Sequence, residues 1–548
     1  MQEPANQHDV QLFRADRMIT MTGDPAEAIA ALGGVVIASG GLEDLRRTYP
    51  KAPVTDFGAA TVMPGFNDAH IHLAMAAELL LHPDVSPDTV GSIGDIQDVI
   101  RAEAAQKPPG SWIKAYRYDD GKTAENRVIT RWDLDQAAPD HPVLIIHIGA
   151  HWGVANSTAL AAVGIDESST PPEGGQYGRG ADERLNGILY ENALFDLAYP
   201  QLADGSEPIV PSAGFDDRIT GLKRAVEMFH AAGLTSVCDA LVGPDDLRLF
   251  IEAQRRGMLT LRVNMLMAAE HYGKMNRLGL VGELGGPQLR LAGIKTFVDG
   301  AIGGRTCYME QPFEGSSDDY GIQTRSTSDL RDIIRTAHED GTRVCIHANG
   351  DRAIKLILGL FEEAQQAAPR EALRHRIEHC TIVNEDIMNR IKRLNAIAVP
   401  FGSYVDYHGS RLLEWYGEER LSRMFAHKWF MQSGVGVAGS SDYPCGPFEP
   451  LRGIQSCATR RGFDGAVMGE NQKVGVADAL WLYTVGSAVA TGEGHYKGRL
   501  APGFLADFVV LRDDPTAVDP TRISQIPVLE TWVGAERVWQ NDPAAALA

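Results

Sequence analysis

The chain has 548 residues, of which 44% are hydrophobic and 22% charged, as in an ordinary globular protein. Its formal net charge of −21 disfavours binding to phosphate backbones, so no nucleic-acid partner is expected. The N-terminal residues lack the basic and apolar regions of a signal peptide, and no run of about 20 apolar residues predicts a membrane span or a membrane partner. The six cysteines form no CxxC pair, so reduced thiols and a cytoplasmic location are expected.

Both ends of the chain are predicted to be rich in β-strands. Residues 8–62 read as short strands separated by glycine turns, with no helix of useful length, and the C-terminal residues repeat this pattern. Two such ends around an α/β middle predict one small β-sandwich domain, formed by residues 1–62 together with residues 495–548.

The middle of the chain, residues 63–494, alternates amphipathic helices with short apolar strands, which is typical of a parallel sheet. Helices that each precede an apolar strand are expected at 221–232, 245–257, 326–341, 352–367 and 384–394. Residues from about 76 to 200 fit this alternation poorly. We predict that they form an insertion between the first and second strands, at the mouth of a pocket.

Residues that can bind metal ions lie far apart in the chain, and almost all of them end an apolar strand-like run: His70, His72, Lys295, His347, His379 and Asp442. A β/α barrel builds one pocket in this way, at the carboxyl ends of its strands. Since residues i and i+2 share a strand face, His70 and His72 can bind one ion together. Two unrelated histidines would give the same short pattern.

Lys295 lies within an apolar strand, where it shares a face with Phe297 and Asp299. Burial of an ammonium group there is costly, so the lysine either forms an internal salt bridge, for example with Asp299, or has a lowered pKa. A neutral amine can react with CO₂. The resulting carbamate is an anionic ligand that can bridge two metal ions.

The remaining three ligands are ambiguous when taken singly. His347 and His379, which would share strand faces with Cys345 and Ile377, could be ordinary core residues, and Asp442 could cap a following helix. Together, four imidazoles, one carbamate and one carboxylate suit two borderline-soft divalent ions. Zn²⁺ is the leading candidate, although Mn²⁺, Fe²⁺ and Co²⁺ suit similar ligands.

The order of these motifs resembles that of the metal-dependent amidohydrolase superfamily. The similarity is carried by VMPGFNDAHIH, IKTFVDGAIGGRTC, HANGDRA, IEHC, GSSDYP and GRLAPGFLADFVVLRDDP. The segment PDHPVLIIHIGAHWGVANSTAL is similar to one in the amidohydrolase family 3 branch, which includes the N-substituted formamide deformylases. Residues 401–417 resemble the family only loosely, and we expect them to form a loop that helps to define the substrate.

The resemblance implies a distorted TIM (β/α)₈ barrel with a small β-sandwich domain. It also implies a binuclear site in which His70, His72 and Asp442 bind the more buried ion. His347 and His379 would bind the more exposed ion, and carboxylated Lys295 would bridge both. Enzymes of this kind are often dimers, so a homodimer is one expected state.

Such a site implies hydrolysis of an amide-type C–N bond in a small molecule by a metal-bound hydroxide. Asp442 would take a proton from the nucleophile and pass it to the leaving nitrogen. His151 could donate to the carbonyl and Arg305 could bind a carboxylate, although loop packing and a structural role also explain these residues. The alternatives are a lactonase, carboxylesterase or phosphotriesterase that uses the same site, and a catalytically silent scaffold.

Overall fold

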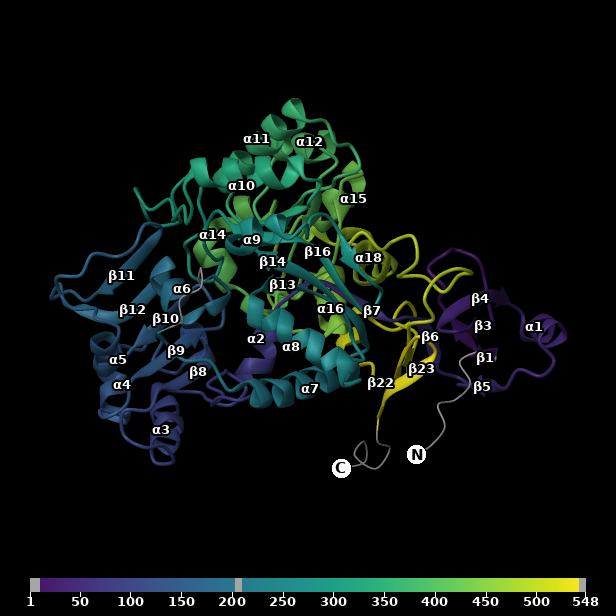
Figure 1. The fold of residues 1–548 in the computed structure, drawn as a ribbon, viewed down its shortest axis with the longest axis horizontal. Coiled ribbons are helices and arrows are strands. Elements are labelled where there is room, and N and C mark those ends of the chain that lie inside the picture. Colours follow the sequence, from purple (N-terminus) through teal and green to yellow (C-terminus); the bar gives the residue numbers. More distant parts are fainter. Residues whose placement is uncertain (1–9, 203–208, 542–548) are drawn as a thin grey trace.

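A curled parallel sheet forms the centre of the computed structural model, which describes residues 10–202 and 209–541. Its parallel strands follow one another in space in the order β7 (Phe66–Ile71), β13 (Leu234–Val242), β14 (Arg262–Ala268), β16 (Leu289–Phe297), β17 (Val344–Ala348), β18 (Arg376–His379), β19 (Ile397–Val399) and β20 (Gly436–Val437) (Figure 1). A short strand, β15 (Leu284–Gly285), runs antiparallel to β16.

The sheet curls until its first strand meets the chain that follows its last strand. The backbone N–H of Ala69 in β7 donates to the carbonyl of Gly439 at 3.2 Å, and the N–H of Asp442 donates to the carbonyl of His70 at 2.9 Å. These two bonds give the sheet a nearly closed form, which is consistent with the predicted barrel.

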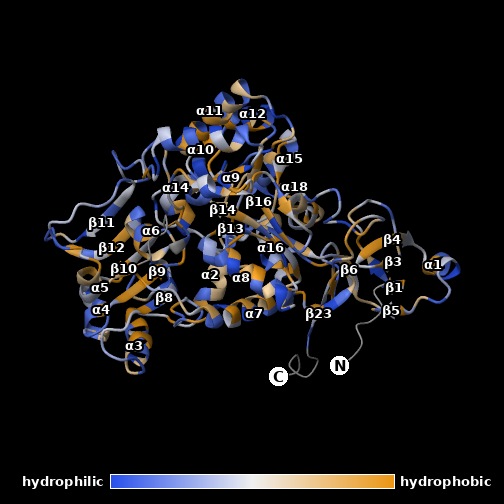
Figure 2. Cartoon of the chain, in the orientation of Figure 1, coloured by the Kyte–Doolittle hydropathy of each residue, from blue (hydrophilic) through white to orange (hydrophobic). Residues whose placement is uncertain are grey.

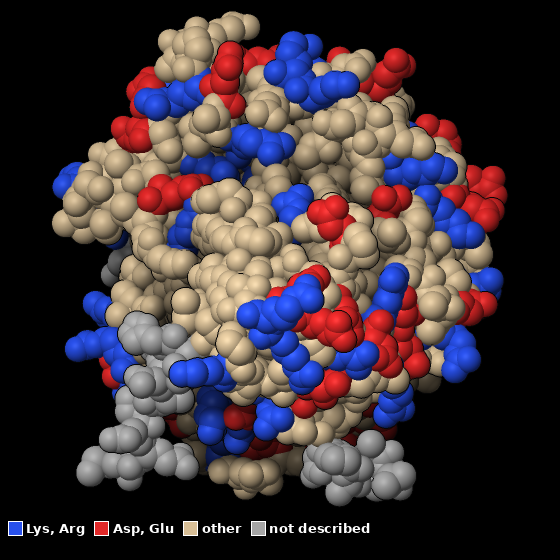
Figure 3. All heavy atoms as spheres, turned by 90° about the vertical axis from the view of Figure 1, so that its right-hand side faces the viewer, with Lys and Arg blue, Asp and Glu red and all other residues tan. Residues whose placement is uncertain are grey.

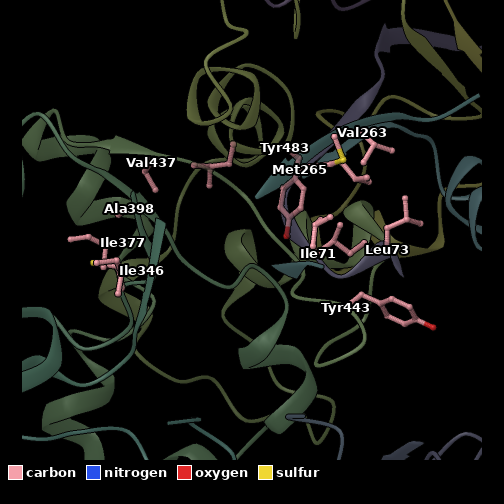
Figure 4. Close-up of a cluster of buried hydrophobic side chains, with 14 of the residues drawn as sticks. Ile71, Leu73, Val263, Met265, Ile346, Ile377, Ala398, Val437, Tyr443 and Tyr483 are labelled. Carbon is pink, nitrogen blue, oxygen red and sulfur yellow. The ribbon is translucent and has the colours of Figure 1, made fainter. Parts of the chain in front are cut away.

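Apolar side chains on the outer face of the sheet form the main hydrophobic core with the surrounding helices. Ile71, Val263, Ile346, Ile377 and Val437 all belong to this cluster, come from five different strands of the sheet and are labelled in Figure 4. The helices alternate apolar and polar residues along their length, as expected for helices with one buried side (Figure 2). They are α2 (Leu73–Leu79), α7 (Phe215–Ala231), α8 (Pro244–Arg255), α9 (Tyr272–Arg277), α10 (Thr327–Glu339), α11 (Asp351–Ala367), α12 (Glu385–Arg393), α15 (His427–Ser433), α16 (Pro450–Thr459), α17 (Val476–Trp481) and α18 (Ser487–Ala490).

A second sheet lies beside the central one and is built from residues that follow β7 and precede β13. It has the order β11 (Gly175–Arg179), β12 (Leu185–Glu191), β10 (Trp152–Ala155), β9 (Val143–His147) and β8 (Ile113–Tyr118), and it lies on the left of Figure 1. Four helices accompany it: α3 (Ile93–Ala104), α4 (Arg131–Ala137), α5 (Ser157–Ala162) and α6 (Asn192–Ala198). The segment that fits the helix–strand alternation poorly therefore has a sheet of its own.

The N-terminal and C-terminal strands lie beside each other toward the right of Figure 1. One sheet has the order β4 (Val35–Gly40), β3 (Ala28–Leu32), β1 (Gln11–Arg14) and β5 (Val54–Asp56). The other joins N-terminal to C-terminal strands, in the order β2 (Arg17–Met18), β6 (Thr61–Pro64), β21 (Phe508–Leu511), β22 (Val528–Val533) and β23 (Glu536–Gln540). Phe13 and Phe508, one from each sheet, share a hydrophobic cluster with ring centroids 5.0 Å apart. Acidic and basic side chains lie intermingled on this face (Figure 3).

Two segments expected to lack helices contain them. Residues 401–417 were expected to form a loop, but they include α13 (Tyr404–His408) and most of α14 (Arg411–Leu421). Leu412 and Tyr416, one helical turn apart, are both buried in one hydrophobic cluster, which explains this helix. The N-terminal region also has a short helix, α1 (Leu42–Thr48), between its strands.

All six cysteines are buried and unpaired. Among the described residues, no helix combines the length and the apolar composition needed to cross a bilayer.

A buried ion pair joins the central sheet to the terminal strands, and it offers a test of how these parts depend on each other. Arg262 of β14 donates from Nε and Nη2 to the two carboxylate oxygens of Asp507, at 2.6 and 2.8 Å. We expect Asp507→Ala to lower the free energy of unfolding by about 3–5 kcal/mol, because it leaves a buried guanidinium unpaired. Urea denaturation measures this effect.

The matched control is Glu363→Ala, which removes the partner of Arg331 in an exposed ion pair. Its expected cost is at most about 1 kcal/mol. Equal effects of the two substitutions would contradict the coupling between the sheet and the terminal strands.

Candidate metal centre

Three of the predicted ligands come together at the carboxyl ends of the central strands. His70, His379 and Asp442 each offer one ligand atom, and these atoms all lie within 4.8 Å of one another. His70 belongs to β7, His379 ends β18, and Asp442 follows β20. Residues from distant parts of the chain thus meet at the edge of the sheet where barrel enzymes build their active sites.

A buried ion pair orients His70. The Arg376 guanidinium donates to both oxygens of Glu378 at 2.7 and 2.8 Å, and Nη2 also donates to the carbonyl of Ala69 at 2.7 Å. Glu378 in turn hydrogen-bonds Nδ1 of His70. Although burial alone would raise it, Arg376 and His70 lower the pKa of Glu378 to about 2. The ionised carboxylate therefore holds the proton on Nδ1, which directs the Nε2 lone pair of His70 toward Asp442.

Asp442 contacts both histidines of the first strand. Its Oδ1 lies 3.1 Å from Nε2 of His72 and 3.2 Å from Nε2 of His70, but the His70 contact is not aligned as a hydrogen bond. Burial opposes ionisation, yet the neighbouring His379 and the hydrogen bond with His72 hold the pKa of Asp442 well below its usual range. Asp442 is therefore a carboxylate at neutral pH, able to bind a cation or to accept a proton.

The backbone at two of these ligands adopts a left-handed conformation. The φ angle is 68° at His379 and 56° at Asp442, which is unusual for residues other than glycine. This turn corrects the expectation that His379 shares a face with Ile377. Ile377 packs outward in the main core, Glu378 faces His70, and the turned backbone brings the next side chain, His379, to the site as well. Such strain is common at functional sites.

Lys295 is fully buried, and its Nζ has no hydrogen-bond partner among the described residues. Lys295 does not form a salt bridge with Asp299, which was one of the two possibilities that the sequence allowed. Asp299 instead accepts backbone N–H bonds from Tyr308, Asn349 and Gly350, at 2.8–3.0 Å. Burial lowers the pKa of Lys295, although Glu378 and Asp442 oppose this shift. A lysine in this environment is easier to deprotonate than one in water.

His347 ends up in the same cavity lining as Lys295, from the neighbouring paired strand β17. Its Nε2 is 3.1 Å from the carbonyl of Gly300 and 3.0 Å from the side-chain amide of Asn349. Its ring centroid is 4.5 Å from that of His379. Burial lowers the pKa of His72 to about 4 and holds the pKa values of His347 and His379 well below their usual range, so these imidazoles are neutral, as metal ligands must be.

The site opens into a cavity of about 30 Å³. That volume exceeds the space that one water molecule needs. Its polar wall contains His72, Lys295, His347, His379 and Asp442, and the rest is mainly apolar: Met75, Ala150, Phe195, Tyr199, Leu202, Leu241, Phe297 and Cys445. The described lining includes no arginine. The cavity therefore suits a small, neutral group beside the candidate ligands.

His151 lines this cavity, as a functional role would require, whereas Arg305 does not. His151 lies between β9 and β10 of the inserted sheet, and its Nδ1 hydrogen-bonds Oε2 of Glu191 at 2.6 Å. Arg305 lines a separate open cavity of about 510 Å³ and places its guanidinium 5.3 Å from the centre of the Phe313 ring. Arg305 therefore lies outside the candidate site and would not contact a substrate bound there.

Several residues that shape the site were missed by the sequence analysis. Glu378 could have been found, because strand alternation places it opposite the outward-facing Ile377. Asp68 ties β7 to the last strand, since it accepts the backbone N–H groups of His70 and Ser441. Glu191 carries no local signal, since its partner His151 is 40 residues away in a different strand connection.

A second cluster of metal-binding residue types consists of Asp119, Asp120 and His147. Nδ1 of His147 accepts the backbone N–H of Gly149 at 3.0 Å, so in the neutral ring the proton lies on Nε2, which faces Asp120 at 3.5 Å. A protonated nitrogen cannot bind a metal, and this cluster is best explained as a hydrogen-bonded turn.

The candidate site fits a divalent cation better. Nε2 of His70, Nδ1 of His379 and Nζ of Lys295 are buried without hydrogen-bond partners in the described part of the chain. Buried polar atoms without partners are costly, and a cation would satisfy them. Two imidazoles beside a carboxylate also match the ligand preferences of Zn²⁺ and related ions.

Comparison with known proteins identifies the family and the fold. The sequence pattern of the amidohydrolase family matches residues 54–539. An N-substituted formamide deformylase from Arthrobacter pascens is 28% identical over 542 residues, with 96% of this chain and 97% of the relative covered. Crystal structures of uncharacterized metal-dependent hydrolases from Pyrococcus horikoshii and Pyrococcus furiosus have the same fold, with TM-scores of 0.73 and 0.71 at 24% identity. The alignments cover 93% and 92% of this chain, and 99% and 100% of the two structures. Because the family match spans most of the sequence, the chain belongs to the amidohydrolase family, as its motifs predicted.

Proposed function

We propose that this protein hydrolyses an amide-type C–N bond in a small, neutral molecule. The observation that carries this proposal is the ionised Asp442 beside His70 and His379, at one end of a narrow and mainly apolar cavity. A carboxylate in this position can take a proton from an attacking water and return it to a leaving nitrogen. Amines are poor leaving groups, so the returned proton matters more for an amide than for an ester.

The described residues that would hold metal are His70, His72, His379 and Asp442, with His347 and a carboxylated Lys295 completing a binuclear centre. When bound, divalent ions would make water more acidic and would stabilise negative charge on the carbonyl oxygen. Zn²⁺ is our leading candidate. The buried, unpartnered Nζ of Lys295 supports the carbamate, because a neutral amine is the form that reacts with CO₂.

We also propose that the curled sheet is a distorted (β/α)₈ barrel and that the terminal sheets form a β-sandwich domain. The backbone bonds that join β7 to the segment after β20, and the cluster shared by Phe13 and Phe508, support these two assignments.

The reaction class is tested with matched substrates. Purified protein loaded with Zn²⁺ and bicarbonate should hydrolyse N-substituted formamides, the class named for the Arthrobacter relative, and lose this activity when a chelator removes the metal. Lactones, carboxylic esters and phosphotriesters serve as comparison substrates. A higher kcat/KM for any of them would favour that reaction class, and binding of less than one metal equivalent would favour a silent scaffold.

Lys295→Ala tests the bridging carbamate. We expect this variant to lose bound metal and activity, because it removes the proposed anionic ligand between the ions. Short carboxylic acids added to the buffer should partly restore both by occupying the same space. Metal analysis and kcat together measure the effect, and full activity in the variant would contradict a carbamate at this position.

Glu378→Gln tests the orientation of His70. The substitution keeps the shape of the side chain and removes the charge that holds the proton on Nδ1. We expect metal affinity to fall by about 10–100-fold, the usual effect of losing such a partner. Glu385→Gln, at an exposed position in the first turn of α12, is the matched control. Unchanged affinity in both variants would remove this role from Glu378.

Asp442→Asn tests proton transfer. We expect kcat to fall by about 10²–10⁴-fold while much of the metal is retained, because an amide can still act as a neutral ligand but cannot shuttle a proton. The measurement compares kcat with metal content in one preparation. An unchanged kcat would assign proton transfer to another group.

A further inference from the structure

We infer that His151 recognises the N–H group of the scissile amide by accepting a hydrogen bond at Nε2, and that Glu191 fixes the ring for this purpose. This inference rests on the proposed function. It assigns the preference for an amide over an ester to one residue between β9 and β10, for which the sequence had suggested donation to the carbonyl instead.

The Glu191 carboxylate, which has no access to solvent, contacts the His151 ring at Nδ1. Glu191 has an exposed fraction of 0%, and its Oε2 lies 2.6 Å from Nδ1 of His151. The other oxygen, Oε1, accepts a 2.5 Å hydrogen bond from the hydroxyl of Thr306. The Glu191 backbone N–H also donates to the carbonyl of His151 at 2.7 Å. Two groups thus hold the carboxylate, and two bonds, one from its side chain and one from its backbone, join Glu191 to His151.

This arrangement decides which nitrogen of His151 carries the proton. Oε1 of Glu191 accepts from Thr306 and Oε2 faces Nδ1 of His151, so we assign the proton of this contact to Nδ1. In the neutral ring Nε2 then has a lone pair, and the side-chain hydrogen bond of His151 to the described residues is made at Nδ1. Since His151 lines the cavity, this lone pair is available to a bound molecule.

The acceptor stands beside the candidate metal ligands. The ring centroid of His151 is 4.7 Å from that of His347, and the rings of Phe195 and Phe297 lie 5.3 and 6.0 Å away. The imidazoles of His151 and His347 are thus polar groups beside the apolar rings of Phe195 and Phe297. A substrate N–H placed there would be paired, whereas an ester oxygen would meet another lone pair.

The surrounding backbone is built tightly around this pair. Ala150 and Glu191 have φ angles of 57° and 50°, in the region that favours glycine. A side chain at Gly300 would come within 2.3 Å of Glu191 Oε1, while the Gly300 carbonyl lies 3.1 Å from Nε2 of His347. The loop after β16 therefore contacts Glu191, which orients His151, and also the candidate metal ligand His347. Simple loop packing does not require both contacts.

The test compares formanilide, N-methylformanilide and phenyl formate, which differ at the atom that His151 would contact. We expect His151→Phe, which keeps a ring of similar size, to lower kcat/KM for formanilide by about 10–100-fold. The values for the other two substrates should change by less than about 3-fold. Because the comparison is a ratio between wild type and variant, differences in intrinsic reactivity and in steric fit cancel.

A second measurement does not depend on turnover. Proton-coupled ¹⁵N NMR at pH 8, on protein labelled at histidine, reports which nitrogen of His151 carries the proton, and loss of the signal in His151→Phe assigns it. We expect Nδ1–H in the wild type. Glu191→Leu, which keeps the volume but removes the acceptor, should shift the proton toward Nε2 and reduce the preference for formanilide.

The outcomes separate this inference from the proposed function. Turnover of formanilide with an unchanged substrate ratio in His151→Phe would overturn the role of His151 alone, as would an Nε2–H proton in the wild type. Hydrolysis of phenyl formate without any turnover of formanilide would overturn both proposals. A selective loss on formanilide, together with an Nδ1–H proton, supports the inference.

Discussion

The buried ion pair between Arg376 and Glu378 is the interaction on which the candidate site depends. Both side chains are fully buried inside the curled sheet, and together they join β18 to β7 through the Ala69 carbonyl and the His70 ring. A buried pair of this kind is stable only when its remaining hydrogen bonds are satisfied, and here each partner finds a further group. The pair thus fixes both the spacing of two strands and the tautomer of one ligand.

Two further buried carboxylates near the cavity also join separate parts of the chain through hydrogen bonds. Asp68 ties the first strand to the chain after the last strand, and Asp299 collects three backbone N–H groups beside His347. Burial raises the pKa of Asp68 to about 6 and that of Asp299 to about 7, even though these hydrogen bonds oppose the shift. Carboxylates that bind backbone groups at strand ends hold loops in place, and Asp68 does so at Ser441, next to the left-handed Asp442.

Regular strand geometry explains which parts of the site could be predicted. Ile71 packs outward between the two histidines of HIH, and Ile294 packs outward beside Lys295, as alternation requires. The prediction for His379 was wrong because alternation ends where the backbone turns. The helices in residues 401–417 were missed because their apolar residues are buried by contacts with distant segments, and the resemblance to the family is weakest there.

The sequence by itself determined the family, the alternation of helices and strands, and the residue types gathered at strand ends, because these depend on local periodicity and on motif order. Only the tertiary structure decided which ligands meet, which carboxylate orients each histidine, and that His151 rather than Arg305 reaches the cavity. Those facts depend on contacts between residues separated by 40 to more than 300 positions, such as His151 with Glu191 and His70 with Glu378. No local pattern encodes such distances, since the curvature of the sheet and the path of the insertion set them.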